Sequence, residues 1–443
     1  MIHSVRQTVL PGALRVVTIE RPDFHRCLLS ARVAVGSRHE RRRTSGITHL
    51  LEHMLFRGTE ALPRAAMFND AVESLGASFN AATHGDFTLF EMLSPPESTA
   101  PALALLADVF RAPVFADLSL EKAIVREEIN EDLDENGVDI NPDNVCRAQV
   151  FGRHPLGWPI TGSLASVAGI SREMLVAHHR AFCVTRNMVL TVVGPLPHEA
   201  VLAMVARHFT GLTEGEAAAP APFTIAPPRK SVTVVKNRDS QSVVRVAFAT
   251  PGATSPAARA IDLVFRVLDD GMSTRLHRRI CDERGLAYEI SAGVEFFDEV
   301  GVADVASSVS PARVPELVHE TLDVLAALCL EGPAATELQK AQRRYAFSLA
   351  SMQDELETLS DFYGTSALFG RHPTPERRLA EVMALSPEDV RRGACLALSP
   401  AMMNISVVGD VSARDRRALG DLARQYTERL AVLGDLTLRP ALS

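Results

Sequence analysis

The sequence predicts an α+β protein in which one chain contains two homologous domains. The first observation is a Pro- and Ala-rich stretch near the midpoint, residues 214–230, which has neither helical nor strand periodicity and is typical of an interdomain linker. The second is a β-rich run closed by Gly that occurs twice, at residues 186–194 and 402–410. These runs are much further apart than solenoid repeats, so the recurrence indicates two copies of a large domain.

Each copy also opens in the same way, with a strand-like run followed by a helical pattern. The opening runs are residues 26–36 and 242–252. Strands gathered at intervals, with helical stretches grouped between them, favour an α+β architecture in each half. We therefore expect an N-terminal domain at residues 1–213, a linker at 214–230 and a C-terminal domain at 231–443.

The composition is that of a globular protein with several buried cores. Of the 443 residues, 47% are hydrophobic and 23% are charged. The formal net charge of −8 argues against a general attraction to nucleic acids or anionic membranes. Pro11 and Gly12 interrupt the N-terminal segment where a signal peptide needs an apolar run, and the six cysteines form no CxxC pair. We expect a cytoplasmic protein that binds neither nucleic acid nor membrane.

A pair of histidines marks the first candidate site. Residues 44–56 place apolar side chains at spacings of three and four after a Thr/Ser start, which predicts an amphipathic helix. Within it, His49 and His53 are four residues apart and lie on one helix face, where both imidazoles can reach one metal ion. Glu52 lies beside them. The pattern therefore predicts two metal ligands and a base on one helix.

A second helix, predicted at residues 118–133 with Ser119 as N-cap, supplies carboxylates. A hydrolytic metal site needs a third protein ligand, an open position for water and a carboxylate base. The candidates are Glu121, Glu127, Glu128 and Glu131. Glu121 and Glu128 share a face two turns apart, whereas Glu127 is rotated by ~100° from it. Periodicity alone leaves the choice between Glu127 and Glu128 open.

Residues 46–59, GITHLLEHMLFRGT, closely resemble the inverted zinc motif of the pitrilysin-like peptidases, also called inverzincins. Other segments resemble the same family in the family's order, with an Asn-Ala-x-Thr strand, a distal-glutamate helix, the loop that follows it, a closing strand and the signature of an inactive second repeat. These segments are residues 78–90, 121–129, 154–163, 186–194 and 271–290. The resemblance spans nearly the whole chain and is greatest to the two-domain bacterial subfamily similar to mitochondrial processing peptidase.

The resemblance implies a role for each residue of the candidate site. His49, His53 and Glu128 match the three ligands of one Zn²⁺ per chain. Glu52 matches the general base, and Glu121 matches a carboxylate behind the ligands. The implied activity is zinc-dependent endopeptidase cleavage of peptides or short unfolded polypeptides, in which zinc activates water without a covalent intermediate.

The resemblance also implies how substrate is held. Extended peptides in the family add to a sheet edge, which matches Asn80, Ala81 and Ala82 here. Backbone pairing of this kind predicts a broad sequence preference. The alternative for Asn80 is a strand-end residue satisfied by its own backbone. In the second half Tyr288 matches a substrate-gripping tyrosine, but the family's partner arginine, seven residues earlier, is replaced by Cys281.

A thiol cannot replace the directed donors of a guanidinium group, although Arg278 and Arg279 lie within one turn before Cys281. Tyr288 could instead be a core aromatic residue. Relatives of this length pair two chains into a four-domain clamshell around a chamber. The complete zinc set with an incomplete gripping pair favours a heterodimer with a similar chain that lacks the zinc motif, and a homodimer is the alternative. A non-catalytic structural or peptide-capturing subunit is the alternative function.

Overall fold

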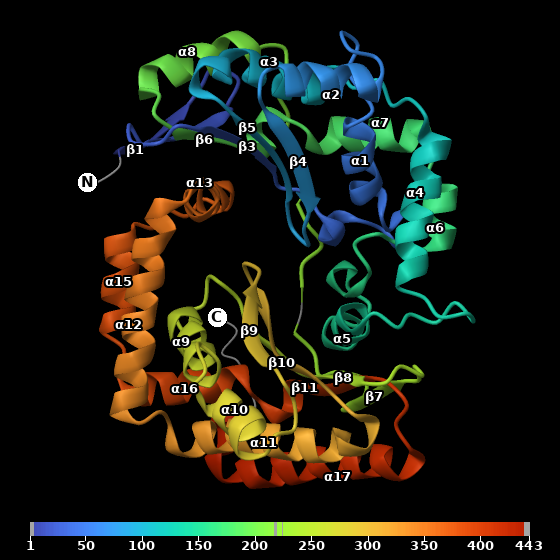
Figure 1. The fold of residues 1–443 in the computed structure, drawn as a ribbon, viewed down its shortest axis with the longest axis vertical. Helices are drawn as coiled ribbons and strands as arrows, with labels where there is room; N and C mark the ends of the chain where they lie inside the picture. Colours follow the sequence, from blue (N-terminus) through green and yellow to red (C-terminus); the bar gives the residue numbers. More distant parts are fainter. Residues whose placement is uncertain (1–3, 217–218, 224, 438–443) are drawn as a thin grey trace. The chain divides into compact units, whose positions relative to one another are not determined.

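The computed structural model describes residues 4–216, 219–223 and 225–437 and divides into two compact units (Figure 1). Each unit is discontinuous in sequence. The first unit consists of Met1–Ile129, Trp158–Ala221 and Ala350–Pro373, and the second of Asn130–Gly157, Pro222–Leu349 and Thr374–Ser443. The linker predicted at residues 214–230 separates the two sequence repeats, and that division stays a prediction. Each compact unit contains segments from both sides of this linker.

A six-stranded sheet with the order β1-β2-β6-β3-β5-β4 forms the centre of the first unit. Its strands are β1 (Ser4–Val9), β2 (Arg15–Glu20), β3 (Cys27–Val33), β4 (Ser78–Thr83), β5 (Thr88–Ser94) and β6 (Met188–Gly194). β2 and β6 are parallel, and the other neighbours are antiparallel. All seven residues of β3 are buried, as expected for a central strand covered on both faces.

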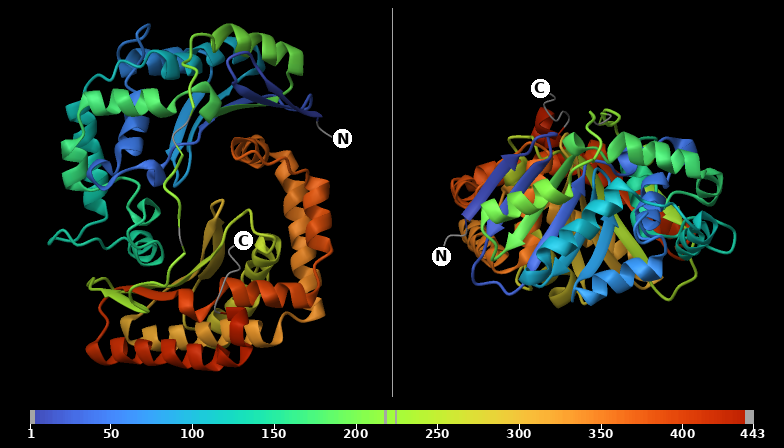
Figure 2. Two further views of the ribbon diagram at one scale, coloured as in Figure 1. Left: turned by 180° about the vertical axis from the view of Figure 1, so that it is seen from behind. Right: turned by 90° about the horizontal axis from the view of Figure 1, so that it is seen from above.

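Helices cover both faces of this sheet. Figure 2 shows α3 and α8 lying over one face, where they contact β5 and β2, respectively. From the third segment of the unit, α13 contacts β3 and β6 and buries Leu356 and Leu359 against them, and α14 contacts β6. The helices of the first unit are α1 (Ile47–Leu55), α2 (Ala65–Ser74), α3 (Thr99–Arg111), α4 (Leu118–Glu131), α6 (Leu164–Gly169), α7 (Arg172–Phe182), α8 (His198–His208), α13 (Leu356–Ser360) and α14 (Ser366–Leu368).

The second unit contains a five-stranded sheet with the order β7-β11-β8-β10-β9. Its strands are β7 (Val232–Val235), β8 (Ser242–Pro251), β9 (Ile290–Phe296), β10 (Val300–Val309) and β11 (Met403–Val408). β7 and β11 are parallel and the remaining pairs are antiparallel, so the topology repeats that of β2-β6-β3-β5-β4. The predicted α+β architecture is therefore confirmed, and the repeated strand order supports a duplication.

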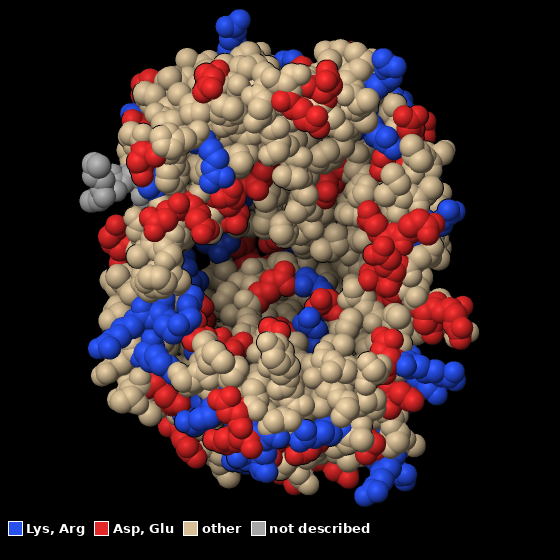
Figure 3. Space-filling model, viewed as in Figure 1, with Lys and Arg blue, Asp and Glu red and all other residues tan. Residues whose placement is uncertain are grey.

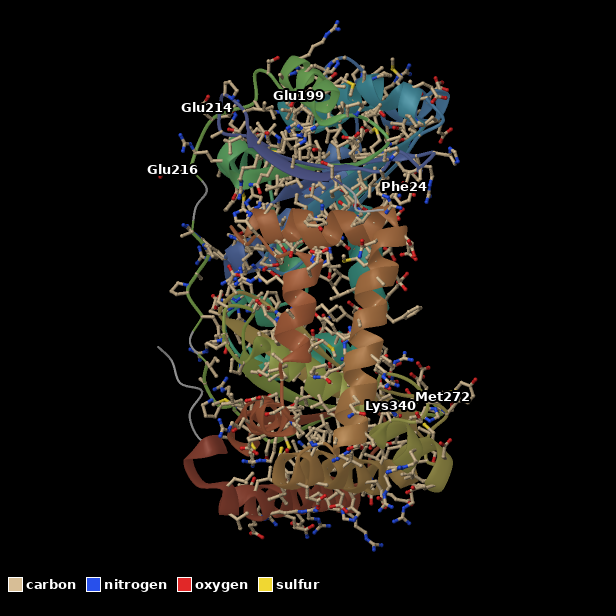
Figure 4. The ribbon with its side chains drawn as sticks, turned by 90° about the vertical axis from the view of Figure 1, so that its left-hand side faces the viewer. Phe24, Glu199, Glu214, Glu216, Met272 and Lys340 are labelled. Carbon is tan, nitrogen blue, oxygen red and sulfur yellow. The ribbon has the colours of Figure 1, made fainter. Side chains whose placement is uncertain are left out.

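Many of the helices of the second unit contact the strands of this sheet. They are α5 (Pro142–Val150), α9 (Ala258–Leu268), α10 (Arg275–His277), α11 (Val314–Glu331), α12 (Ala335–Ser351), α15 (Pro375–Met383), α16 (Pro387–Ala397) and α17 (Ala413–Leu430). On α12, Lys340 donates to the carbonyl and hydroxyl oxygens of Ser273 at 2.9 and 3.0 Å, beside the exposed Met272 (Figure 4). In the described part of the chain, no helix is both long and apolar enough to cross a membrane.

The closing glycines have the same steric role in both sheets. A Cβ atom on Gly194 would lie 2.6 Å from Sγ of Cys27, the first residue of β3. A Cβ atom on Gly409 would lie 2.0 Å from Oγ of Ser242, the first residue of β8. A side chain at either position would overlap the neighbouring strand, which explains why the β-rich run ends in Gly in both repeats.

Candidate metal centre

α1 begins later than predicted, and the N-cap predicted for α4 is wrong. α1 starts at Ile47, and its N-cap is Gly46 with a φ of +86°, not the Thr or Ser before it. α4 starts at Leu118, so Ser119 lies inside the first turn and is not the N-cap. The apolar face of α1 is buried as predicted, which leaves His49, Glu52 and His53 on the less buried side of the helix.

The structure brings His49, His53 and Glu128 together. The two imidazole centroids are 4.6 Å apart. Nε2 of His49 lies 3.6 Å from one oxygen of Glu128, and Nε2 of His53 lies 3.5 Å from the other. One ligand atom from each of the three residues lies within 4.8 Å of the others, and this is the one such group in the described ranges. Adjacent α1 and α4 position these side chains (Figure 1).

This donor set fits a zinc ion. Four-coordinate zinc with bonds of ~2.0–2.1 Å holds its ligand atoms about 3.3 Å apart, close to the two separations observed. These two distances are longer than good hydrogen bonds, so the Glu128 carboxylate faces both imidazole nitrogens without a hydrogen bond to either. The alternative Glu127 lies on the surface with 68% of its side chain exposed and pairs with Arg126. The structure therefore groups Glu128, and not Glu127, with the histidines.

Glu121 lies behind His53, where it can orient the ring. Its Oε2 is 3.0 Å from Nδ1 of His53, and its other oxygen pairs with the guanidinium group of Arg57. Burial opposes ionisation of Glu121, but His53 and Arg57 outweigh it and hold its pKa below the usual value. Burial lowers the pKa of His53, but the hydrogen bond and charge of Glu121, together with the charges of Glu128 and Glu52, outweigh it and raise this pKa. A hydrogen-bonded carboxylate of this kind fixes the tautomer of a ligating histidine.

Glu52 faces the end of strand β4. Its Oε2 accepts a hydrogen bond from the hydroxyl of Thr83, the last residue of that strand. Burial raises the pKa of Glu52, although the Thr83 hydroxyl acts in the opposite direction. Thr83 and Arg57 were not singled out from the sequence, yet both lie inside the segments that resemble the family, four residues or fewer from a proposed site residue.

Buried polar side chains also lie around the first turn of α1. They include three histidines, called here the histidine cluster: His39, His178 and His179. Burial lowers the pKa of each to about 4, so these rings are neutral near pH 7. Nε2 of His178 lies 3.1 Å from the hydroxyl of Thr48 in the first turn of α1. Burial also raises the pKa of Glu40, another of these side chains, to about 7, against the effect of its backbone donors.

β4 is the edge strand beside this centre. It pairs only with β5 in the sheet order, in a register that places Asn80, Ala81 and Ala82 opposite Glu91, Phe90 and Leu89. Asn80 is exposed in the middle of the strand, so the strand-end alternative for it is wrong. Acidic side chains predominate on the surface over α4 nearby, where Glu127 and Glu131 are exposed (Figure 3).

In the second unit, Tyr288 is 98% exposed, which contradicts the core-aromatic alternative. Cys281 lies in a π-helical segment, Arg278–Glu283, and burial raises its pKa. Arg279 is held by the buried Glu320 at 2.5 Å, which also binds Arg284 at 2.8 Å. The guanidinium group of Arg279 is therefore already engaged in this ion pair. Arg278 remains 64% exposed, 3.6 Å from Glu283.

Comparison with known proteins identifies relatives of this chain and of its fold. Residues 15–162 match the family model Insulinase (Peptidase family M16), and residues 169–345 match the model Peptidase M16 inactive domain. An uncharacterized zinc protease of Mycobacterium tuberculosis is 30% identical over 89% of this chain and 91% of its own length. The chain belongs to peptidase family M16. An uncharacterized zinc protease of Streptomyces coelicolor is 25% identical over 95% of this chain and 93% of the relative.

Two solved structures share the fold. A peptidase M16 inactive domain from Pseudomonas fluorescens has a TM-score of 0.85 and 22% identity, covering 92% of this chain and 99% of that one. A protease from Helicobacter pylori has a TM-score of 0.83 and 19% identity, covering 92% and 100%. The described fold is therefore the mixed α+β fold of M16 proteins.

Proposed function

We propose that this chain is a zinc-dependent endopeptidase. The observation that supports this most directly is the convergence of His49, His53 and Glu128 on one point, with Glu52 on the same helix and Glu121 behind His53. Zinc held by these ligands would lower the pKa of a water molecule and polarise the scissile carbonyl. Members of such families that serve only as structural or peptide-capturing subunits need none of these ligands, so the complete set favours catalysis over that alternative.

The chain's own residues would move the proton and hold the peptide. Glu52 accepts the proton of the attacking water and returns it to the leaving nitrogen. The Thr83 hydroxyl fixes the orientation of the Glu52 carboxylate through its hydrogen bond. An extended peptide pairs with the outer edge of β4 at Asn80, Ala81 and Ala82, where backbone contacts tolerate many sequences.

The working assembly is proposed to pair two chains in a four-domain clamshell. A fully exposed Tyr288 is available to bind substrate, whereas Cys281 leaves the arginine of the gripping pair missing. A similar chain without the zinc motif would supply that arginine in a heterodimer, and a homodimer would rely on Tyr288 with Arg278. A cytoplasmic location is expected for this enzyme.

The test measures zinc and activity on the purified full chain. We expect one zinc per chain by metal analysis and cleavage of internally quenched peptides of varied sequence. Light scattering gives the mass of the active species, and addition of a candidate partner chain tests the heterodimer. A chain that binds no zinc and cleaves no peptide, alone or with that partner, would contradict the proposal. Full activity as a homodimer would contradict the heterodimer only.

A further inference from the structure

The helix that holds both histidines has no cap of its own. Its N-cap residue, Gly46, has no side chain, and its first turn contains no acidic residue. The amide groups of a first helical turn have no partners within the helix and carry a partial positive charge. Glu40 lies six residues upstream and is 6% exposed. It supplies both an acceptor for these amides and a negative charge beside them. Its carboxylate accepts the N–H of Gly46 at 2.7 Å and the N–H of Thr48 at 2.9 Å.

Glu40 is held in place by the hairpin that contains β4. The N–H of Arg38 donates to the carbonyl of Gly85, in the turn between β4 and β5, at 2.9 Å. The N–H of Glu40 donates to the carbonyl of Ser37 at 3.1 Å. A Cβ atom on Gly36 would lie 2.3 Å from the carbonyl oxygen of His84, so the two loops are in direct contact. The carboxylate is therefore fixed relative to the strand beside the metal centre.

The two histidines are supported unequally. Glu121 orients His53 through Nδ1. For Nδ1 of His49, which is buried, the described residues provide no hydrogen-bond partner. His49 directly follows Thr48, one of the two residues that Glu40 holds. The direction of its imidazole ring therefore depends on the backbone of the first turn of α1.

We propose that Glu40 is a positioning residue for the zinc site, which fixes the first turn of α1 and thereby aims His49 at the metal. This inference rests on the proposed function, because it assigns Glu40 a part in zinc binding. It gives His49 a support that corresponds to the one Glu121 gives His53. The support acts through the backbone of the helix and not through the ring.

The test uses Glu40→Gln in the metal-free full chain at pH 8. The amide keeps the shape of the side chain, but its NH₂ group faces a backbone N–H and only one acceptor oxygen remains. We expect the affinity for zinc and for cobalt to fall ~10–100-fold, as for other groups that orient metal ligands. We also expect amides in the first turn of α1 to exchange faster with deuterium. Glu60→Gln, at an exposed position beyond the C-terminal end of α1, removes the same charge and is expected to change neither quantity.

A double-mutant cycle separates positioning from general destabilisation. In a His49→Ala background, Glu40→Gln should cause no further loss of cobalt affinity, whereas in a Glu121→Gln background its loss should add in full. Equal losses in both backgrounds, or wild-type metal affinity in Glu40→Gln, would overturn the inference. If Glu40→Gln does not fold, the same cycle is run with Glu40→Asp, which keeps the charge but cannot reach both amides. Failure of the wild-type chain to bind zinc would instead refute the proposed function.

Discussion

Glu52→Gln separates the proposed base from the proposed ligands. The substitution keeps the shape of the side chain, and the amide oxygen can still accept the hydrogen bond that the Thr83 hydroxyl donates. None of the three grouped ligand atoms belongs to Glu52, so zinc should stay bound at one per chain. Only the ability to take a proton is lost. Loss of a general base lowers kcat by ~10²–10⁴-fold, which corresponds to about 3–5 kcal/mol in the activation free energy.

The assay combines metal analysis with kcat measured on a quenched peptide, for wild type and for two variants. Glu127→Gln is the matched control, because it makes the same change on the exposed side of α4 and should keep both zinc and activity. A Glu52→Gln enzyme that retains zinc and cleaves peptide at the wild-type rate would refute the assignment of Glu52. Loss of zinc in that variant would show that Glu52 holds the metal.

Three further outcomes are expected. Alanine at any one of the three proposed ligands should remove most of the bound zinc, whereas Glu127→Ala should keep it. If Glu127→Ala lost zinc and Glu128→Ala kept it, the wrong face of α4 would have been assigned to the metal. Each histidine of the cluster has a pKa of 6.5 when unfolded and about 4 when folded. The free energy of unfolding is therefore highest above pH 6.5. It falls by up to about 3 kcal/mol per histidine as the pH falls towards 4. Urea midpoints between pH 7 and 4.5 should therefore vary less in His179→Gln than in wild type, and equal slopes would contradict this. Gly409→Ala should cost about 1–3 kcal/mol of unfolding free energy through overlap with β8, whereas Gly169→Ala, with open space around its Cβ, should be nearly neutral in the same denaturation assay.

The duplicated α+β fold could be predicted from the sequence because its signals are local. Central strands are rich in apolar and β-branched residues, and in each repeat a glycine lies at the end of the last strand or directly after it. The histidine pair could also be predicted, since a spacing of four fixes two side chains on one face of any helix. Glu128 could be chosen over Glu127 only through the resemblance to a family, because the packing angle of α4 against α1 is a tertiary property.

The parts that could not be predicted depend on contacts between distant segments. Thr44 and Ser45 offer an ordinary helix cap, yet the helix starts after them, and Glu40 accepts from its first amides. The segment that carries Glu40 is held by the distant β4–β5 turn, where the N–H of Arg38 donates to the carbonyl of Gly85. Composition likewise does not reveal that Arg279 is held by Glu320. The exchange of segments between the compact units had no local signal either, since residues 350–373 continue an ordinary helical pattern.

That exchange determines when the N-terminal unit can finish folding during synthesis. Its sheet buries Leu28, Val189 and Val193 under residues that follow position 350. Arg32, completely buried in the same sheet, donates to Ser360 and Asp361 of that late segment. A nascent chain that has passed the linker therefore exposes an apolar sheet face with a cation in it. The first unit can therefore be completed only after residues 350–373 have been synthesised and have left the ribosome.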